Sequence, residues 1–227
     1  WCMPPHLTEC GEDKVESVDR MAIDLGLSTE EAQELVSPGD RVLVRAPQKR
    51  LLGTRITSPA LDDRAGCAAL IRCAQLLRNQ TLSCGLTILL SSREEAGGQG
   101  AQTGAYSLEP TEAIAVDVSF AAQPGVDPAK CGKLGGGPMI GMAPILNRPM
   151  TNRLLELAKE HEIPYSMEIM GGETGTNADE IAVSRTGVPT AMVSIPLRYM
   201  HTPVEVIDTQ DVAYTARLLA EYVKGVD

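Results

Sequence analysis

Three short apolar runs constrain the fold of this 227-residue chain more than any other feature of its sequence. They are Cys84-Gly-Leu-Thr-Ile-Leu-Leu90, Ala113-Ile-Ala-Val116 and Thr190-Ala-Met-Val-Ser-Ile195. Each is short enough to be a strand buried on both faces, as the strands of a parallel sheet are. From Ser58 onward these runs alternate with segments of helical spacing. The alternation predicts an α/β fold, a mostly parallel sheet flanked by helices.

Three segments before, between and after these runs carry the helical spacing. One begins near Arg64, one spans about residues 149–162, and the last follows Thr209, which we interpret as its N-cap. Their apolar stripes are formed by Cys67, Leu70, Ile71, Ala74 and Leu77, by Leu154, Leu155 and Ala158, and by Val212, Ala216, Leu219 and Val223.

Residues 1–57 have a different pattern. Ser28-Thr-Glu-Glu31 is a capping box, which predicts a short helix to about Leu35. Gly39-Asp40 then turns the chain into Arg41-Val-Leu-Val-Arg45, a predicted short strand. We interpret residues 1–57 as the end of a small β-rich domain and residues 58–227 as a second domain.

Composition excludes some functions. The formal charge is -10, with no Lys/Arg run, so the surface would repel nucleic acid. No apolar run approaches the roughly 20 residues that cross a bilayer, which argues against a membrane protein. The six cysteines form no C-x-x-C pair, and three lie in apolar stretches. We read them as reduced, which favours a cytoplasmic location.

Acidic residues stand where two predicted strands end. Glu94 and Glu95 follow the run 84–92, and Asp117 closes the next strand. The carboxyl ends of parallel strands are where such sheets form sites. Taken alone, Glu94 and Glu95 could be a solvated charge cluster. Asp117 is costly to bury unless it is paired, hydrogen-bonded or bound to a metal ion.

Two further candidates also have plainer interpretations. Asp62-Asp63 precedes a predicted helix and could simply cap it. His201 lies past the strand 190–195, in a loop stiffened by prolines, where a histidine can equally be a surface residue. Together, however, the carboxylates and the imidazole form an oxygen-rich, thiol-free set suited to two divalent ions. A further carboxylate, not bound to metal, could move a proton beside them.

These same residues lie in segments that resemble a known family. The segments Ala60-Leu-Asp-Asp-Arg-Ala-Gly66, Ser92-Arg-Glu-Glu-Ala-Gly97, Ala115-Val-Asp117 and Ile195-Pro-Leu-Arg-Tyr-Met-His-Thr-Pro-Val-Glu205 resemble the tetrahedral aminopeptidases, also labelled glutamyl aminopeptidase or cellulase M. Pro4-Pro-His-Leu7 and Ile23-Asp-Leu-Gly26 resemble that family's inserted dimerisation domain. The resemblance implies that 1–57 is the C-terminal part of this inserted domain and 58–227 a zinc-peptidase-like catalytic domain.

The resemblance also implies roles for individual residues. Asp62 would bridge two zinc or cobalt ions, Glu95 and His201 would complete one ion's ligands, and Asp117 would bind the other. Hydrolysis would proceed through a metal-bridging hydroxide with Glu94 as general base, and Asp63 would orient Asp62. Gly172, in the Gly171–Gly175 loop, and Arg198 are expected to line the substrate cleft. Peptides would be the substrates, and the family assembles as a homo-oligomer of twelve subunits.

The chain departs from the family at one point. The family uses an early His in a His-x-Asp segment as a ligand of the second ion, and no His-x-Asp occurs here. His6 belongs to a different motif, and His161 is interpreted as a surface residue. We hypothesise that the parent protein carries this His upstream of Trp1. The second metal site is therefore expected to be incomplete in this chain, and the sequence leaves the activity of the fragment itself open.

Two other functions stay open at this stage. Paired carboxylates also cleave sugars, so a cellulase-type glycosidase is the alternative enzyme. Aromatic residues make up only 3% of the chain, which leaves few rings for stacking on sugars. A binding or regulatory relative that has lost catalysis is the third possibility, and the missing His is its support.

Overall fold

The computed structural model describes residues 21–226, which divide into two compact units between Val44 and Arg45. In the first unit, α1 (Thr29–Leu35) begins at the predicted capping box. The Ser28 hydroxyl accepts from the Glu31 N–H at 3.3 Å, and the Glu31 carboxylate accepts from the Ser28 N–H at 2.9 Å. The predicted strand 41–45 is wrong, because this exposed segment pairs with no described strand. That residues 1–57 belong to a dimerisation domain stays a prediction.

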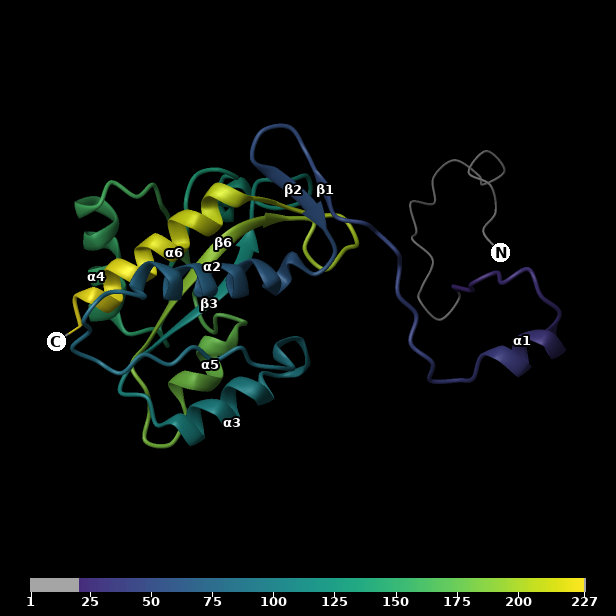
Figure 1. Cartoon of the computed structure of the whole chain (residues 1–227), viewed down its shortest axis with the longest axis horizontal. Helices are drawn as coiled ribbons and strands as arrows, with labels where there is room; N and C mark the ends of the chain where they lie inside the picture. The colour runs from purple at the N-terminus through teal and green to yellow at the C-terminus, as the bar shows by residue number, and fades with distance from the viewer. Residues whose placement is uncertain (1–20, 227) are drawn as a thin grey trace. The chain divides into compact units, whose positions relative to one another are not determined.

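The second unit contains a seven-stranded sheet flanked by helices, which confirms the predicted fold class (Figure 1). The order is β1-β2-β7-β6-β4-β5, and β3, which lies off this path, also pairs with β6. The strands are β1 (Lys49–Arg50), β2 (Arg55–Ser58), β3 (Ala113–Phe120), β4 (Met139–Met142), β5 (Ser166–Ile169), β6 (Thr190–Arg198) and β7 (Glu205–Asp208).

The sheet is mixed, whereas the sequence pattern predicted mostly parallel pairing. Only β3–β6 and β4–β5 run parallel among the described pairs. The other four pairs are antiparallel. A short loop joins β6 to β7, and neighbouring strands joined so closely must run in opposite directions. Because β1 and β2 belong to this sheet, the unit begins before the boundary that we placed after residue 57.

Helices cover both faces of the sheet. The helices α2 (Leu61–Leu77), α4 (Arg148–Glu160) and α6 (Thr209–Lys224) pack together on one face. On the opposite face lie α3 (Gln99–Leu108) and α5 (Asn177–Ala182) (Figure 1). The N-cap of α6 is Asp208, which accepts from the Gln210 N–H, and not the predicted Thr209. No helix of the described chain is long and apolar enough to cross a membrane.

The apolar run 84–90 is not the buried strand that its composition predicted. It belongs to no helix or strand of the described chain, and Leu86 and Leu90 are 43% and 55% exposed. A strand needs a partner for its backbone groups, and β3 pairs only with β6 in the part of the chain described. An apolar cavity of about 430 Å³ separates the run from β3. The run thus forms one wall of a groove rather than part of the sheet.

The centre of the unit is β6, which is buried from Thr190 to Leu197. It has strands on both edges and helices over both faces, so its side chains are shielded on all sides. Asp117 on β3 pairs in register with Ser194 on β6. Asp117 does not close its strand as predicted, because β3 continues to Phe120. The pairing nevertheless places Asp117 beside the strand that leads into the His201 loop.

Candidate active site

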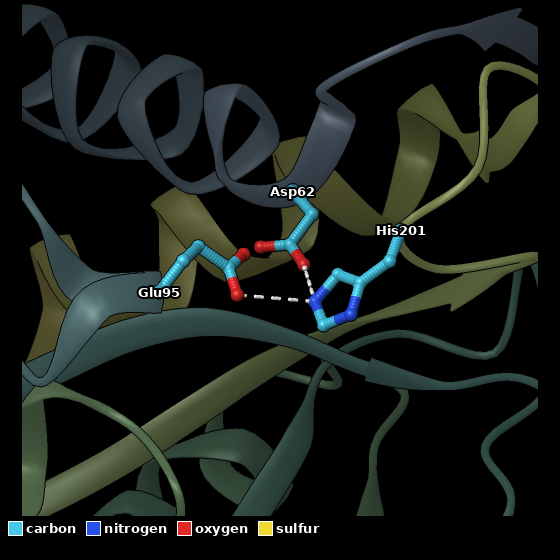
Figure 2. Close-up of side chains that lie close together, drawn as sticks. All are labelled: Asp62, Glu95 and His201. Atoms are coloured by element: carbon cyan, nitrogen blue, oxygen red, sulfur yellow. Dashed lines mark ion pairs between the residues drawn. The ribbon is translucent and has the colours of Figure 1, made fainter. Parts of the chain in front are cut away.

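Three of the predicted ligand side chains point toward one another and converge (Figure 2). Asp62 lies at the start of α2, Glu95 in the short 3-10 helix η3 (Glu94–Ala96), and His201 in the loop between β6 and β7. The Nε2 atom of His201 is 3.1 Å from Asp62 Oδ2 and 3.2 Å from Glu95 Oε2. Elements that are far apart in the chain therefore aim these three groups at one point.

The donor set fits a divalent metal ion. Each of the three residues offers one ligand atom, and these atoms lie within 4.8 Å of one another. Around zinc, tetrahedral N and O ligands at about 2.0–2.2 Å lie roughly 3.3 Å apart, close to the separations seen here. The His201 side chain is 63% exposed and the Asp62 side chain 9%, so the cluster is open on one side. A fourth position is thus accessible to water or substrate.

Glu94 and Asp117 line the same cavity, of about 400 Å³, as the three converging residues. Burial raises the pKa of Asp117 to about 7, against a hydrogen bond from the Val118 N–H, and Asp62 and Glu94 add repulsion. Burial, followed by repulsion from Glu95, also raises the pKa of Glu94. The sequence prediction that these acids share a site is consistent with this placement.

Crowded carboxylates make the cavity strongly attractive to cations. The pKa of Asp62 is raised to about 6, first by burial and then by repulsion from Glu95. His201 acts in the opposite direction and lowers it. Like charges this close disfavour full ionisation, and a bound cation would relieve the repulsion.

Asp63 caps the start of α2, which is the plainer interpretation given above for the Asp62-Asp63 pair. Asp62 and Asp63 have non-helical backbone angles, so regular helix begins at Arg64, as expected. The Asp63 Oδ1 atom accepts from the Gly66 N–H at 2.8 Å. Burial, and then repulsion from Asp117, raises the pKa of Asp63 to about 8. Asp63 does not line the cavity, so its orienting role toward Asp62 stays a prediction.

The two predicted substrate-binding residues lie outside the cavity lining. Gly172 is exposed, and the cavity is lined instead by Thr174, Gly175 and Thr176 of the following segment. Arg198 ends β6 with its Nε atom buried and without a hydrogen-bond partner among the described residues. Contact of either residue with substrate stays a prediction.

Sequence reasoning assigned no role to two acids near the site. Glu168 on β5 lines the cavity and accepts from the hydroxyls of Ser119 and Ser194, the latter at 2.7 Å. Its neighbours Met167 and Ile169 are exposed, so no apolar pattern in this strand signals the position. Glu205 is 2% exposed, and its carboxylate accepts hydrogen bonds from the backbone N–H groups of Asp62 and His201. Its closeness to His201 in the sequence was the available signal.

The fold and site define a class, an α/β protein whose carboxylates and imidazole form a site of the kind that holds divalent metal ions. Comparison with known proteins identifies its family. The profile of the M42 glutamyl aminopeptidases matches residues 2–218, and the chain belongs to that family. The resemblance seen in the sequence is thereby confirmed.

Individual relatives agree with this assignment. The chain is 36% identical to a lysyl aminopeptidase of Pyrococcus furiosus, over 99% of this chain and 66% of that protein. An aminopeptidase from Desulfurococcus kamchatkensis matches with a TM-score of 0.85 and 31% identity, over 99% of this chain and 63% of that one. The TET1 peptidase of Pyrococcus horikoshii matches with a TM-score of 0.77 and 28% identity, over 99% and 67%. The chain thus spans less than two thirds of the first two relatives' length.

Proposed function

We propose that the protein is a two-metal aminopeptidase that removes the N-terminal residue of peptides. The observation that carries the proposal is the convergence of Asp62, Glu95 and His201 on one point, beside Glu94 and Asp117 in the same cavity. Membership of the aminopeptidase family supports the reaction class. The cavity is open to solvent through the exposed His201, as a site for a peptide end requires.

Asp62, Glu95 and His201 would hold one zinc or cobalt ion, and Asp62 and Asp117 would hold the other. When bound, two such ions supply Lewis acidity that polarises a carbonyl group and lowers the pKa of a water molecule. The protein's own contribution is to place its carboxylates around that position. Asp63 caps α2 and so fixes the start of the helix that carries Asp62.

Glu94 is the proposed general base. It lines the cavity next to Glu95, which faces His201. Its raised pKa makes the carboxylate a better proton acceptor than an ordinary glutamate. Glu94 would take a proton from the water as its oxygen bonds to the carbonyl carbon, and would deliver that proton to the leaving amine as the C–N bond breaks.

The second ion is proposed to bind more weakly than the first in this chain. Asp117 lines the cavity but is absent from the converging group of three. The described residues place no second imidazole beside it. A further ligand, such as the family's early His, would complete this position.

We extend two further properties to this protein as proposals. The Pyrococcus horikoshii relative is described as assembling into a tetrahedron or a large octahedral shell, so a homo-oligomer is proposed here. The described cysteines Cys67, Cys73, Cys84 and Cys131 are free, which agrees with a reducing, cytoplasmic location.

Hydrolysis of aminoacyl-p-nitroanilides tests the proposal. The chain is assayed after chelation and after addition of zinc or cobalt, with Glu94→Gln as the inactive control. Metal-dependent release that disappears in Glu94→Gln supports the aminopeptidase. Turnover of aryl-glycosides that survives chelation would establish the glycosidase instead. Tight metal binding with neither activity, in this chain and in a parent protein that carries the early His, would favour a binding relative.

A further inference from the structure

Glu205 is a buried acid that the proposed reaction does not use. It opens β7, is 2% exposed, and forms no salt bridge within the described residues. A buried carboxylate without a cationic partner is costly unless hydrogen bonds satisfy it. Its environment must therefore supply the missing donors.

Those donors are backbone N–H groups on two separate segments. The Oε2 atom of Glu205 accepts from Leu61 N at 2.6 Å and from Asp62 N at 3.1 Å. The Oε1 atom accepts from His201 N at 2.9 Å. One carboxylate thus connects the backbone of two residues whose side chains meet 3.1 Å apart in the candidate metal site.

The backbone at both segments is in a conformation that needs such support. His201 has a φ of 60°, and Ala60, directly before Leu61, has a φ of 52°. Residues with a Cβ rarely adopt this left-handed region unless surrounding contacts hold them there. The hydrogen bonds to Glu205 supply those contacts on each side of the site.

The backbone of Glu205 is itself held in the sheet. Glu205 pairs in register with Ser58 on β2, the strand that leads into the Leu61–Asp62 turn. The β7 strand also pairs with β6, which leads into the His201 loop. Glu205 therefore stands between the two strands that deliver the two ligands.

We infer that Glu205 is a positioning residue, whose carboxylate sets the separation of Asp62 and His201 and so the affinity of the site for a divalent ion. The inference rests on the proposed function only in taking these two residues as ligands. Partners that orient metal ligands typically contribute 10–100-fold in metal affinity, and a loss of that order is expected here.

The test is Zn²⁺ affinity of the 227-residue chain, measured by competition with a chromophoric chelator. In Glu205→Gln the amide nitrogen replaces one acceptor oxygen and meets a backbone N–H, which leaves one segment unheld. Zn²⁺ affinity is expected to fall about 10–100-fold. The visible absorption spectrum of bound Co²⁺, which reports ligand geometry, is expected to change as well.

Asp211→Asn is the matched control. Asp211 is fully buried and accepts from the N–H groups of Gly135 and Gly137, each at 2.8 Å, away from the cavity. Both variants should lower the unfolding temperature, but only Glu205→Gln should weaken Zn²⁺ binding. Equal losses of affinity in the two variants, or an unchanged affinity in Glu205→Gln, would overturn the inference.

Two outcomes separate this inference from the proposed function. If the unaltered chain binds no Zn²⁺, the proposed metal site fails and the inference fails with it. If that chain binds Zn²⁺ and Glu205→Gln binds equally well, only the role of Glu205 is refuted. Should Glu205→Gln not fold, amide hydrogen exchange of the unaltered chain decides. Slow exchange at Asp62 and His201 is required, and free exchange there refutes the positioning role of Glu205.

Discussion

The carboxylate of Asp63 and the backbone of Gly66 fit so closely that position 66 has no room for a side chain. Asp63 Oδ1 accepts from the Gly66 N–H at 2.8 Å, and a Cβ on Gly66 would come within 2.7 Å of that same oxygen. The start of α2, which carries Asp62, therefore depends on a glycine one turn further along the helix.

Gly66→Ala is expected to displace Asp63 and destabilise the protein. Crowding of a well-packed position costs about 1–3 kcal/mol, which chemical unfolding will measure. Gly85→Ala is the control, because a Cβ there meets nothing within 4 Å. Equal stability of the two variants would show that the Asp63 side chain moves aside without loss of stability.

The adjacent residues Glu94 and Glu95 are expected to have different roles, the first as general base and the second as metal ligand. Glu94→Gln should lower kcat by about 10²–10⁴-fold, because the proposed general base is lost, and should leave Zn²⁺ affinity nearly unchanged. Glu95→Gln should weaken Zn²⁺ binding, since Glu95 Oε2 lies 3.2 Å from His201 Nε2. Isothermal titration with Zn²⁺ and initial-rate assays on both variants make the comparison. The opposite pattern would exchange the two assignments.

Stability of the metal-free protein is expected to fall as the pH rises. Burial raises the pKa of Asp117 to about 7 and that of Asp63 to about 8, both from 3.8. A carboxyl group whose pKa is raised in the folded state stabilises the fold while it is protonated. This contribution to stability is complete in acid and is lost as the pH rises through the folded-state values of about 7 and about 8. Thermal unfolding between about pH 5 and about pH 8 should show a falling Tm.

Added Zn²⁺ is expected to reverse this trend, because the ion binds the deprotonated carboxylates and its affinity increases with pH. Asp63→Asn removes one titrating group and should flatten the metal-free profile. A metal-free Tm that rises over the same range would contradict the burial of these acids.

Substitution of leucines should cost much more stability in the buried core than in the run 84–90, which forms a wall of the groove. Leu154→Ala, at a fully buried position, is expected to cost about 2–5 kcal/mol of unfolding free energy. Leu90→Ser, at a position 55% exposed, should cost about 0.5 kcal/mol or less. Urea unfolding of both variants tests the difference. A large loss in Leu90→Ser would mean that the run 84–90 is packed in solution.

Local patterns predicted the elements whose stability is local and the strands that found a pairing partner. The capping box at Ser28 and Glu31 closes within one turn, so its residues alone specify the start of α1. The runs within β3 and β6 became strands because those strands pair with each other in parallel register. The run 84–90 has an equally apolar composition but no pairing partner, and composition by itself does not encode pairing.

The sequence by itself determined the family and the chemical types of the candidate ligands, because these depend on residue identity and short-range spacing. Only the tertiary structure decided which of those groups meet. It brought Asp62, Glu95 and His201 to one point, left Gly172 outside the cavity, and linked two ligand segments through Glu205. The physical reason is that side chains distant in sequence converge only through sheet order and register, which arise from long-range hydrogen bonding and packing.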